Sequence, residues 1–186
     1  MLGELVQLLT AHQALDVHEQ MCQKRMLDVI ETKEITSSQF FSPGHFTASA
    51  FVLSPDEQSV LLIFHPGFQK WIQPGGHLEK EDASIRKAAL REVHEETSLD
   101  SMKLIDWIPG ILDLDVHQVP ASARKQQPSH EHYDVRFVFR ALEEKGRASN
   151  EIKQLKWVRL DCLQALDTDA SVQRGLRRID WHRKNR

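Results

Sequence analysis

Apolar side chains recur at intervals of three and four residues through the first part of the chain. They are Leu2, Leu5, Val6, Leu9, Met21, Cys22, Met26, Leu27 and Ile30, and no proline interrupts them. Such spacing places side chains on one face of a helix, so we predict one or two amphipathic helices here. The stretch ITSSQFFSPG that follows is polar and ends in Pro-Gly, which is typical of a connector.

The pattern then changes to short runs that are rich in β-branched and aromatic residues. HFTASAFVL and SVLLIFH are separated by the turn SPDEQ, which predicts a hairpin. WIQPGGHLE contains two short extended pieces around a Pro-Gly-Gly turn. Further strands are expected at KLIDWI, ILDLDVHQV, YDVRFVFRAL and IKQLKWVRL.

Between these strands, ASIRKAALREVHEETS is rich in helix-forming residues and predicts one central helix. Asp82 is suited to cap its start, and Ser98 stands where glycine often ends a helix. Two more helices are expected from Asp161 and from about Asp169. Strands on both sides of a central helix predict a mixed α/β domain at residues 41–186, preceded by a helical extension at residues 1–40.

Composition narrows the functional classes. The chain has 186 residues, 40% of them hydrophobic and 27% charged, and a net charge of -3, which argues against nucleic acid as a partner. Cys22 and Cys162 match no zinc or redox spacing, as expected for the reducing cytoplasm. No apolar run reaches the about 18 residues of a membrane span, and the start MLGELVQLL has no basic region, so we expect neither anchor nor signal peptide.

The central helix carries three glutamates close together, Glu92, Glu95 and Glu96. At 100° per residue they fall within an arc of roughly 100° on one helix face. Taken alone, they could be an ordinary solvated face. The preceding Pro-Gly-Gly turn brings backbone close to them, and Arg91 could orient a carboxylate or meet a phosphate. A divalent cation would reverse the repulsion among the acids, and Mg²⁺ prefers such oxygen ligands.

The stretch GGHLEKEDASIRKAALREVHEETSL (residues 75–99) resembles the Nudix box, G-x5-E-x7-R-E-U-x-E-E-x-G-U, where U is aliphatic. The core REVHEE matches in full, as do the initial Gly-Gly and the final Leu99. There are two departures. The segment from Gly76 to Arg91 is one residue longer, so the first glutamate of the box has three candidate counterparts, Glu81, Asp82 and Ala83, of which Asp82 suits best. Ser98 replaces the second glycine.

The resemblance implies an α/β/α sandwich with a mixed sheet, spanning about 115 residues between His45 and Leu160. Family members often carry another metal-binding glutamate before a late strand that contains tryptophan, and NEIKQLKWV nominates Glu151, although a polar residue opening a strand would look the same. Residues 1–40 do not resemble the family. We interpret them either as a cap or as a dimerisation element. In the second case the protein would be a homodimer.

What the resemblance implies about activity is Mg²⁺-dependent hydrolysis of a nucleoside diphosphate linked to another moiety, by attack of water at phosphorus, with Mn²⁺ as a substitute ion. The Gly75 carbonyl and the side chains of Glu92, Glu95, Glu96 and Glu151 would hold the metal. Arg91 would take part in catalysis, and the general base would be Glu95 or Glu151.

Two other functions are open. A catalytically silent Nudix-like domain would bind nucleotides without turnover, but such a domain would be expected to lose acids of the box, and all three remain. An isomerase of the isopentenyl-diphosphate type needs a cysteine near the site, and neither cysteine is placed for that role.

A second group of polar residues lies on two predicted strands. Asp113, Asp115 and His117 alternate along LDLDVH, and His130, His132, Asp134 and Arg136 alternate along SHEHYDVRF. If the two faces adjoin, they could bind the rest of the substrate, hold a transition metal or simply be surface positions. For substrate contacts we name His77, Asp115, His117, His130, His132 and Tyr133. Trp71 could also stack on a base, whereas His94 lies away from the acids.

Overall fold

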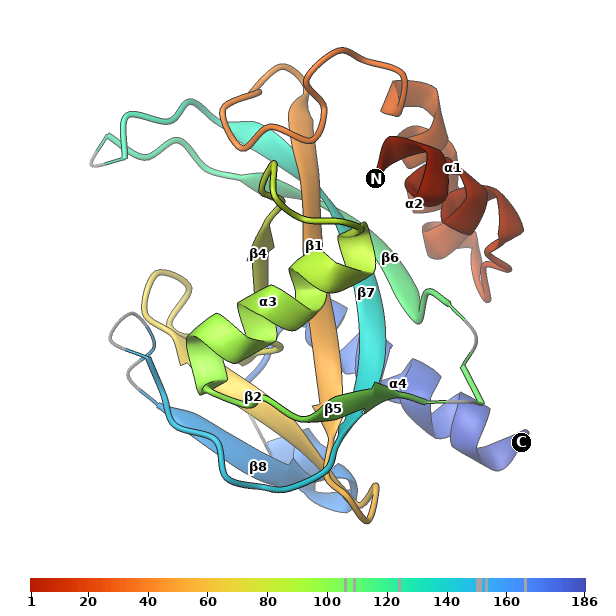
Figure 1. Cartoon of the computed structure of the whole chain (residues 1–186), viewed down its shortest axis with the longest axis vertical. Helices are drawn as coiled ribbons and strands as arrows, with labels where there is room; N and C mark the ends of the chain where they lie inside the picture. The colour runs from red at the N-terminus through yellow and green to blue at the C-terminus, as the bar shows by residue number, and fades with distance from the viewer. Residues whose placement is uncertain (106, 109, 124, 150–151, 153, 166) are drawn as a thin grey trace.

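The structure is a computed structural model of the whole chain (Figure 1). It describes every residue except 106, 109, 124, 150, 151, 153 and 166, and for residues 163–165 the backbone alone. The helices are α1 (Leu2–Ala11), α2 (Val17–Val29), α3 (Ile85–Thr97) and α4 (Ala170–Lys184), with a 3₁₀ helix, η1, at Leu160–Ala165. The strands are β1 (Gly44–Leu53), β2 (Ser59–His65), β3 (Lys70–Ile72), β4 (Gly75–His77), β5 (Met102–Leu104), β6 (Asp113–Val119), β7 (His130–Ala141) and β8 (Leu155–Arg159).

The strands form a mixed sheet around β1 and β7, which run parallel through ten paired positions from Gly44↔Glu131 to Leu53↔Arg140. The path through the sheet is β3-β2-β1-β7-β5, with β4 beside β1, β6 beside β7 and β8 beside β2. The predicted hairpin is confirmed, since β1 and β2 are antiparallel. At its other end β1 pairs with β4 instead, so the sheet divides there. This division brings the Gly-Gly turn against β1.

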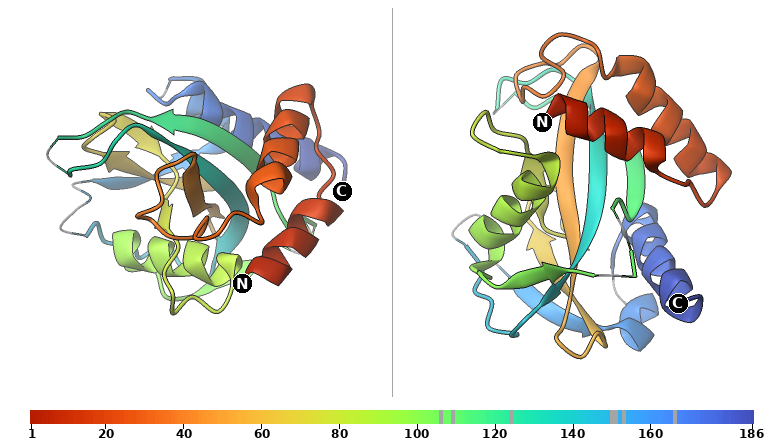
Figure 2. Two further views of the ribbon diagram at one scale, coloured as in Figure 1. Left: turned by 90° about the horizontal axis from the view of Figure 1, so that it is seen from above. Right: turned by 45° about the vertical axis from the view of Figure 1, so that its right-hand side comes forward.

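Helices cover both faces of the sheet (Figures 1 and 2). On one face α1, α2 and α3 share a core with the sheet, centred on residues such as Leu5, Met26 and Val93. On the other face α4 packs Val172, Leu176 and Ile179 against Phe51 and its neighbours. The predicted α/β/α sandwich with a mixed sheet is therefore confirmed. No helix in the described part of the chain is long and apolar enough to span a membrane.

The central helix begins two residues later than expected. Ser84 is its N-cap, and its hydroxyl accepts a hydrogen bond from the amide of Lys87 at 3.1 Å. The prediction that Asp82 caps the helix is wrong, because the Asp82 carboxylate accepts from the Glu79 amide and pairs with Arg91. Ser98 does end the helix, in the left-handed conformation with φ 54°.

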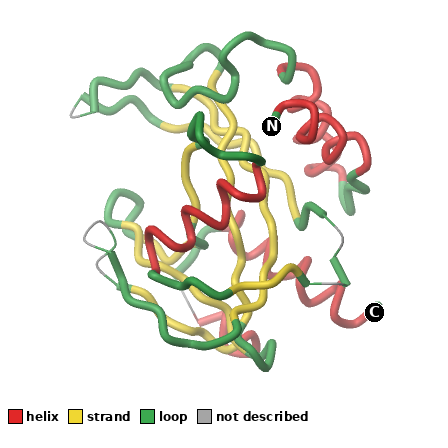
Figure 3. The backbone as a smooth tube through the Cα atoms, in the orientation of Figure 1, coloured by secondary structure: helices red, strands yellow, loops and turns green. Residues whose placement is uncertain are grey.

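Two other helix predictions had different outcomes. The segment from Asp161 forms a 3₁₀ helix, while α4 begins after its N-cap Asp169 as predicted. The N-terminal extension is helical, as expected, and α2 packs beside β6 (Figure 3). Four side chains of the N-terminal extension are buried in the core that it shares with the sheet: Leu5, Leu9, Cys22 and Met26. The extension therefore serves as a cap on the sheet.

Candidate functional site

Two glycines of β4 lie where this strand meets both β1 and α3. A Cβ atom added to Gly75, whose φ is +157°, would lie 2.3 Å from Cβ of Ser49 on β1. A Cβ atom added to Gly76 would lie 2.7 Å from the carboxylate of Glu92 on α3. A larger residue at Gly75 would have to displace β1, whereas at Gly76 only the end of the Glu92 side chain would have to move, so Gly75 is the glycine that this close approach requires.

Three carboxylates lie close together on α3 beside β4, and we name Glu92, Glu95 and Glu96 the acid cluster. Glu96 accepts a hydrogen bond from the amide of Gly75 at 2.9 Å. The side chain of Glu92 is mostly buried, and that of Glu95 is 50% exposed. Burial raises the pKa of Glu92 to about 7, although Arg91 opposes the shift. The cluster therefore has one sheltered member and one member open to a ligand.

Arg91 connects the acid cluster to the turn before it. Its Nη1 donates to Glu92 and to Glu95, each at 3.0 Å. Its Nη2 donates to the backbone carbonyl of His77 at 2.8 Å. Its Nε and Nη2 also form a two-pronged pair with Asp82, at 3.1 and 3.0 Å. Arg91 thereby fixes the positions of two cluster acids relative to β4.

The contacts of Arg91 bear on the first acid of the box. Asp82 is the candidate that pairs with Arg91, whereas Glu81 is exposed to solvent. Burial raises the pKa of Asp82, but the hydrogen bonds from Arg91 and from the Glu79 amide outweigh this effect and lower it overall. The charged form of Asp82 thus holds Arg91 in place, in spite of the longer turn.

The donor atoms of this site suit a hard divalent cation. Three carboxylates lie along one face of α3, beside a glycine turn with further carbonyl oxygens. Mg²⁺ and Mn²⁺ take such oxygen ligands and keep positions for water and phosphate oxygens. Glu92, Glu95, Glu96 and the Gly75 carbonyl therefore fit the ion that the box implies. Glu151, the other nominated ligand, lies outside the described residues.

The second group of polar residues is assembled by the pairing of β6 with β7. The register places Asp113 opposite Arg136, Asp115 opposite Asp134, and His117 opposite His132. The two polar faces therefore adjoin. A third strand contributes, because Thr47 and Ser49 of β1 donate to Asp134 at 3.1 and 2.8 Å.

One half of this surface is a buried ion-pair network. Arg136, 3% exposed, pairs with Asp113, Asp115 and Asp134 at 3.2, 3.0 and 2.9 Å. Arg174 and Arg178 of α4 pair with Asp113 as well, and Arg178 also pairs with Glu19 of α2. We name this set, Glu19, Asp113, Asp115, Asp134, Arg136, Arg174 and Arg178, the ion-pair network.

Asp115 illustrates what the network does to its members. Burial raises its pKa, but hydrogen bonds from His117 and the charges of Arg136 and Arg174 hold that pKa far below its usual range. Its carboxylate is 5% exposed and accepts from both arginines. Asp115, a nominated substrate contact, therefore binds α4 to the sheet.

The other half of the surface is a group of histidines. His130 and His132 of β7 lie beside His45 of β1 and His77 of β4, with ring centroids 4.8 to 5.3 Å apart for most pairs. We name these four the histidine cluster. Burial lowers the pKa of His77 to about 4 and that of His132 to about 2, so both rings are neutral at pH 7.

His45 was not among the residues nominated from the sequence. It lies opposite His132 in the parallel pairing of β1 with β7. The alternation of His45, Thr47 and Ser49 with apolar residues along β1 was the available signal for a polar strand face. Arg174 and Arg178 of α4 were likewise missed, since no spacing in the sequence links the last helix to β6 and β7.

Four other residues discussed from the sequence have clear positions. Tyr133 is 1% exposed, and its hydroxyl donates to Glu131 at 2.8 Å, so its ring packs in the core. His117 is partly exposed and contacts Asp115 at 2.9 Å. Trp71 lies under the ammonium of Lys156, 3.9 Å from the ring centroid. His94 points away from the acid cluster and pairs with the exposed Asp100.

Comparison with known proteins places this geometry in a family. The model of the NUDIX domain matches residues 43–178. A protein of Lactococcus lactis subsp. cremoris (strain MG1363), named "Probable DHNTP pyrophosphohydrolase", is 24% identical over 147 residues, which are 77% of this chain and 82% of that protein.

Two solved structures share the fold. The E. coli dihydroneopterin triphosphate pyrophosphohydrolase has a TM-score of 0.52 and 18% identity, covering 70% of this chain and 91% of that one. The NUDIX domain of Shewanella oneidensis NrtR, solved with ADP ribose, has a TM-score of 0.54 and 17% identity, covering 84% and 96%. Because the NUDIX domain model matches most of the chain, and the REVHEE acids gather beside the two glycines as its box implies, the chain belongs to the Nudix hydrolase family.

Proposed function

We propose that this chain is a Mg²⁺-dependent pyrophosphohydrolase that cleaves the P–O–P bond of a small nucleotide-like substrate by attack of water at phosphorus. The observation that carries the proposal is the acid cluster itself: Glu96 is held by the Gly75 amide, while Glu92 and Glu95 are held by Arg91. Such an arrangement presents several carboxylate oxygens on one side of a turn where a phosphate can approach.

Each residue of the acid cluster, together with Gly75 and Arg91, has a part in this proposal. Glu92, Glu95 and Glu96, with the Gly75 carbonyl, hold the metal, and Arg91 keeps two of the acids in position. When bound, Mg²⁺ neutralises charge on the diphosphate and lowers the pKa of a coordinated water. Glu95, the most exposed of the three acids, is suited to accept a proton from the attacking water. Glu151 remains the second candidate for this role.

For the substrate, the names of two similar proteins suggest a first compound to test. Both the Lactococcus lactis protein and the E. coli enzyme are named for dihydroneopterin triphosphate. A nucleoside diphosphate linked to another moiety, such as ADP-ribose, presents the same anhydride to the acid cluster, and the NrtR domain was solved with that compound. Selectivity between the two depends on residues outside the box.

A panel of substrates tests the proposal. Purified protein is incubated with Mg²⁺ or Mn²⁺ and with dihydroneopterin triphosphate, nucleoside triphosphates, ADP-ribose, nucleotide sugars and dinucleoside polyphosphates, and the released phosphates are identified. We expect metal-dependent cleavage of at least one anhydride, which stops when a chelator is added. Metal-dependent binding of these compounds without any cleavage would instead support a silent nucleotide-binding domain.

The isomerase alternative has no support in the positions of the cysteines. Cys22 is buried in the core on α2, where its thiol contacts His18 at 3.5 Å. Cys162 lies in η1 and contacts Asp161. Neither thiol contacts the acid cluster in the described part of the structure.

A further inference from the structure

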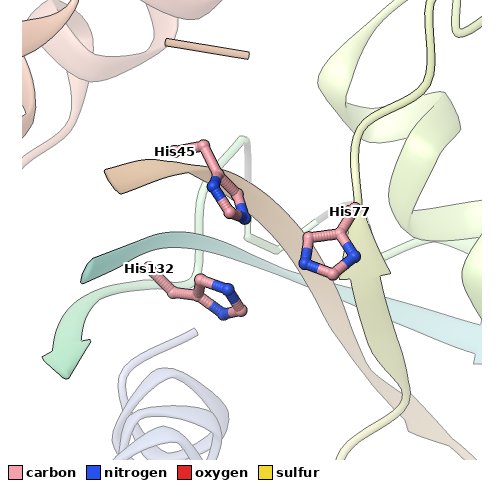
Figure 4. A group of neighbouring side chains, drawn as sticks. All are labelled: His45, His77 and His132. Carbon is pink, nitrogen blue, oxygen red and sulfur yellow. The ribbon is translucent and has the colours of Figure 1, made fainter. Parts of the chain in front are cut away.

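The histidine cluster gathers four imidazoles from three strands. One of these strands, β4, also carries the two glycines beside the acid cluster. His45 comes from β1, His77 from β4, and His130 and His132 from β7. One ring nitrogen from each of His45, His77 and His132 lies within 4.8 Å of the other two. Figure 4 shows these three rings directed toward a common point. Histidines so close together need either hydrogen-bond partners or a shared ligand.

Two of the rings are held with one nitrogen toward the backbone. Nδ1 of His45 lies 2.9 Å from the carbonyl oxygen of Phe40, and Nδ1 of His130 lies 2.8 Å from that of Pro128. A carbonyl only accepts, so each Nδ1 carries a proton, and Nε2 is the nitrogen of each ring that remains to bind a ligand. Metal-binding histidines commonly have this arrangement, in which the second nitrogen donates to a carbonyl and fixes the ring.

The unpartnered Nε2 of His45 is the second observation. The residue is 0% exposed, and its Nε2 has no hydrogen-bond partner among the residues that the structure describes. Buried polar atoms without a partner are rare in folded proteins. Because the Nδ1 contact with Phe40 fixes the ring, this nitrogen is directed into the cluster and not toward solvent.

One pair of ring nitrogens already has the spacing of two ligands of a small cation, while those of His45, His77 and His132 lie within 4.8 Å of one another. Nε2 of His130 and Nε2 of His132 are 3.3 Å apart. In a tetrahedral site with metal–nitrogen distances of about 2.0–2.1 Å, neighbouring ligand atoms are about 3.3–3.4 Å apart. Nitrogen ligands favour Zn²⁺ and related transition metals, whereas Mg²⁺ favours the oxygens of the acid cluster.

We propose that His45, His77 and His132, with His130 as a fourth ligand, bind one Zn²⁺-class transition-metal ion at a site separate from the Mg²⁺ site. The ligands tie β1, β4 and β7 together at the end of the sheet where β4 replaces β2 as the partner of β1. Since Arg91 donates to the carbonyl of His77, the zinc site adjoins the acid cluster through β4. This site does not depend on any particular substrate or on turnover.

The test uses Co²⁺ as a coloured substitute for Zn²⁺. Full-length protein in which Glu92, Glu95 and Glu96 are all changed to Gln is stripped with a chelator and titrated with Co²⁺ in excess Mg²⁺. We expect the strong visible absorption of a four-coordinate nitrogen site, saturation at one ion per chain, and its loss when one equivalent of Zn²⁺ is added. Removal of the acid cluster ensures that the signal does not come from the Mg²⁺ site.

Single substitutions locate the ion. His77→Asn and His132→Asn, each in the triple-Gln background, should weaken Co²⁺ binding at least about tenfold. His94→Asn is the matched control, because His94 is an exposed histidine on α3, and it should bind as the parent does. Circular dichroism of each metal-free protein checks that it is folded. If the triple-Gln protein gives no such absorption, or if His77→Asn and His132→Asn bind Co²⁺ like the control, the four histidines are a packed polar cluster and the proposal is wrong.

Discussion

The acid cluster and the ion-pair network both gather carboxylates, yet they differ in what neutralises them. In the network, Asp113 contacts three guanidinium groups, and Asp115 contacts two. At the acid cluster, the carboxylates of Glu92, Glu95 and the preceding Asp82 share the guanidinium of Arg91, and Glu96 accepts from a backbone amide. Carboxylates that are each paired with two or three arginines hold elements of the fold together. Several carboxylates that share one arginine leave negative charge, which a cation from solution can neutralise.

Burial separates the two regions in the same way. Asp113 is 0% exposed, and the side chain of Glu95 is 50% exposed. A buried charge must be paired within the protein, because the loss of its partner leaves it uncompensated in a medium of low polarity. A partly exposed carboxylate stays hydrated before a ligand binds, so it costs the fold little stability. Substitutions in the two regions should therefore affect different properties of the protein.

The largest effect is expected for Arg136→Met, which removes the centre of the ion-pair network. Asp113, Asp115 and Asp134 would lose a shared partner while they remain buried. The free energy of unfolding, measured by urea denaturation, should fall by about 3–5 kcal/mol. The control is Arg159→Met, which breaks a pair with Asp161 whose side chains are 60% and 62% exposed, and it should leave the free energy of unfolding nearly unchanged. Equal losses of stability in the two variants would show that the ion-pair network contributes no more to stability than an exposed ion pair does.

Glu96→Gln tests the acid cluster from the other direction. The substitution keeps the size of the side chain and an oxygen that can accept from Gly75, but it removes a charge that would hold Mg²⁺. We expect the rate of Mg²⁺-dependent hydrolysis to fall by a factor of about 100 or more. The midpoint of urea denaturation should be unchanged or raised, because fewer like charges repel one another. Glu144→Gln makes the same change at an exposed position and should retain activity. Turnover near wild type in Glu96→Gln would refute its assignment as a ligand.

The two regions also differ in how far they could be predicted from the sequence. Glu92, Glu95 and Glu96 lie within one turn of a single helix, so their spacing alone places them together. The ion-pair network and the histidine cluster depend on pairings between distant segments, such as Thr47 with Asp134, which are 87 residues apart. Alternation along β6 and β7 showed which side chains share a face. It could not show that β1 completes that face with His45, nor that α4 covers it with Arg174.

Asp82→Asn should have an intermediate effect, because it weakens the support of Arg91 and leaves the acids themselves in place. The amide would keep one acceptor oxygen and turn a donor toward the guanidinium, so the two-pronged pair is lost. We expect kcat to fall about tenfold, which corresponds to about 1.4 kcal/mol. Glu81→Gln, one residue away in the same turn and exposed, should change kcat little. The opposite ranking of these two variants would assign the first acid of the box to Glu81.

The smallest effect is expected at the end of α3, where Ser98 takes the place of the second glycine of the box. Ser98 has φ 54°, and its amide donates to the carbonyl of His94, so the residue ends the helix in a conformation that suits glycine better. Ser98→Gly should raise the free energy of unfolding by no more than about 1 kcal/mol, because relief of the left-handed strain exceeds the entropy that glycine loses on folding. Ser98→Ala keeps a Cβ atom and serves as the control, with little or no gain. Activity should be unchanged in both, since the acid cluster lies in the turns before Ser98. A loss of activity in Ser98→Gly at unchanged stability would mean that the end of the helix, and not only its acid face, positions the catalytic residues.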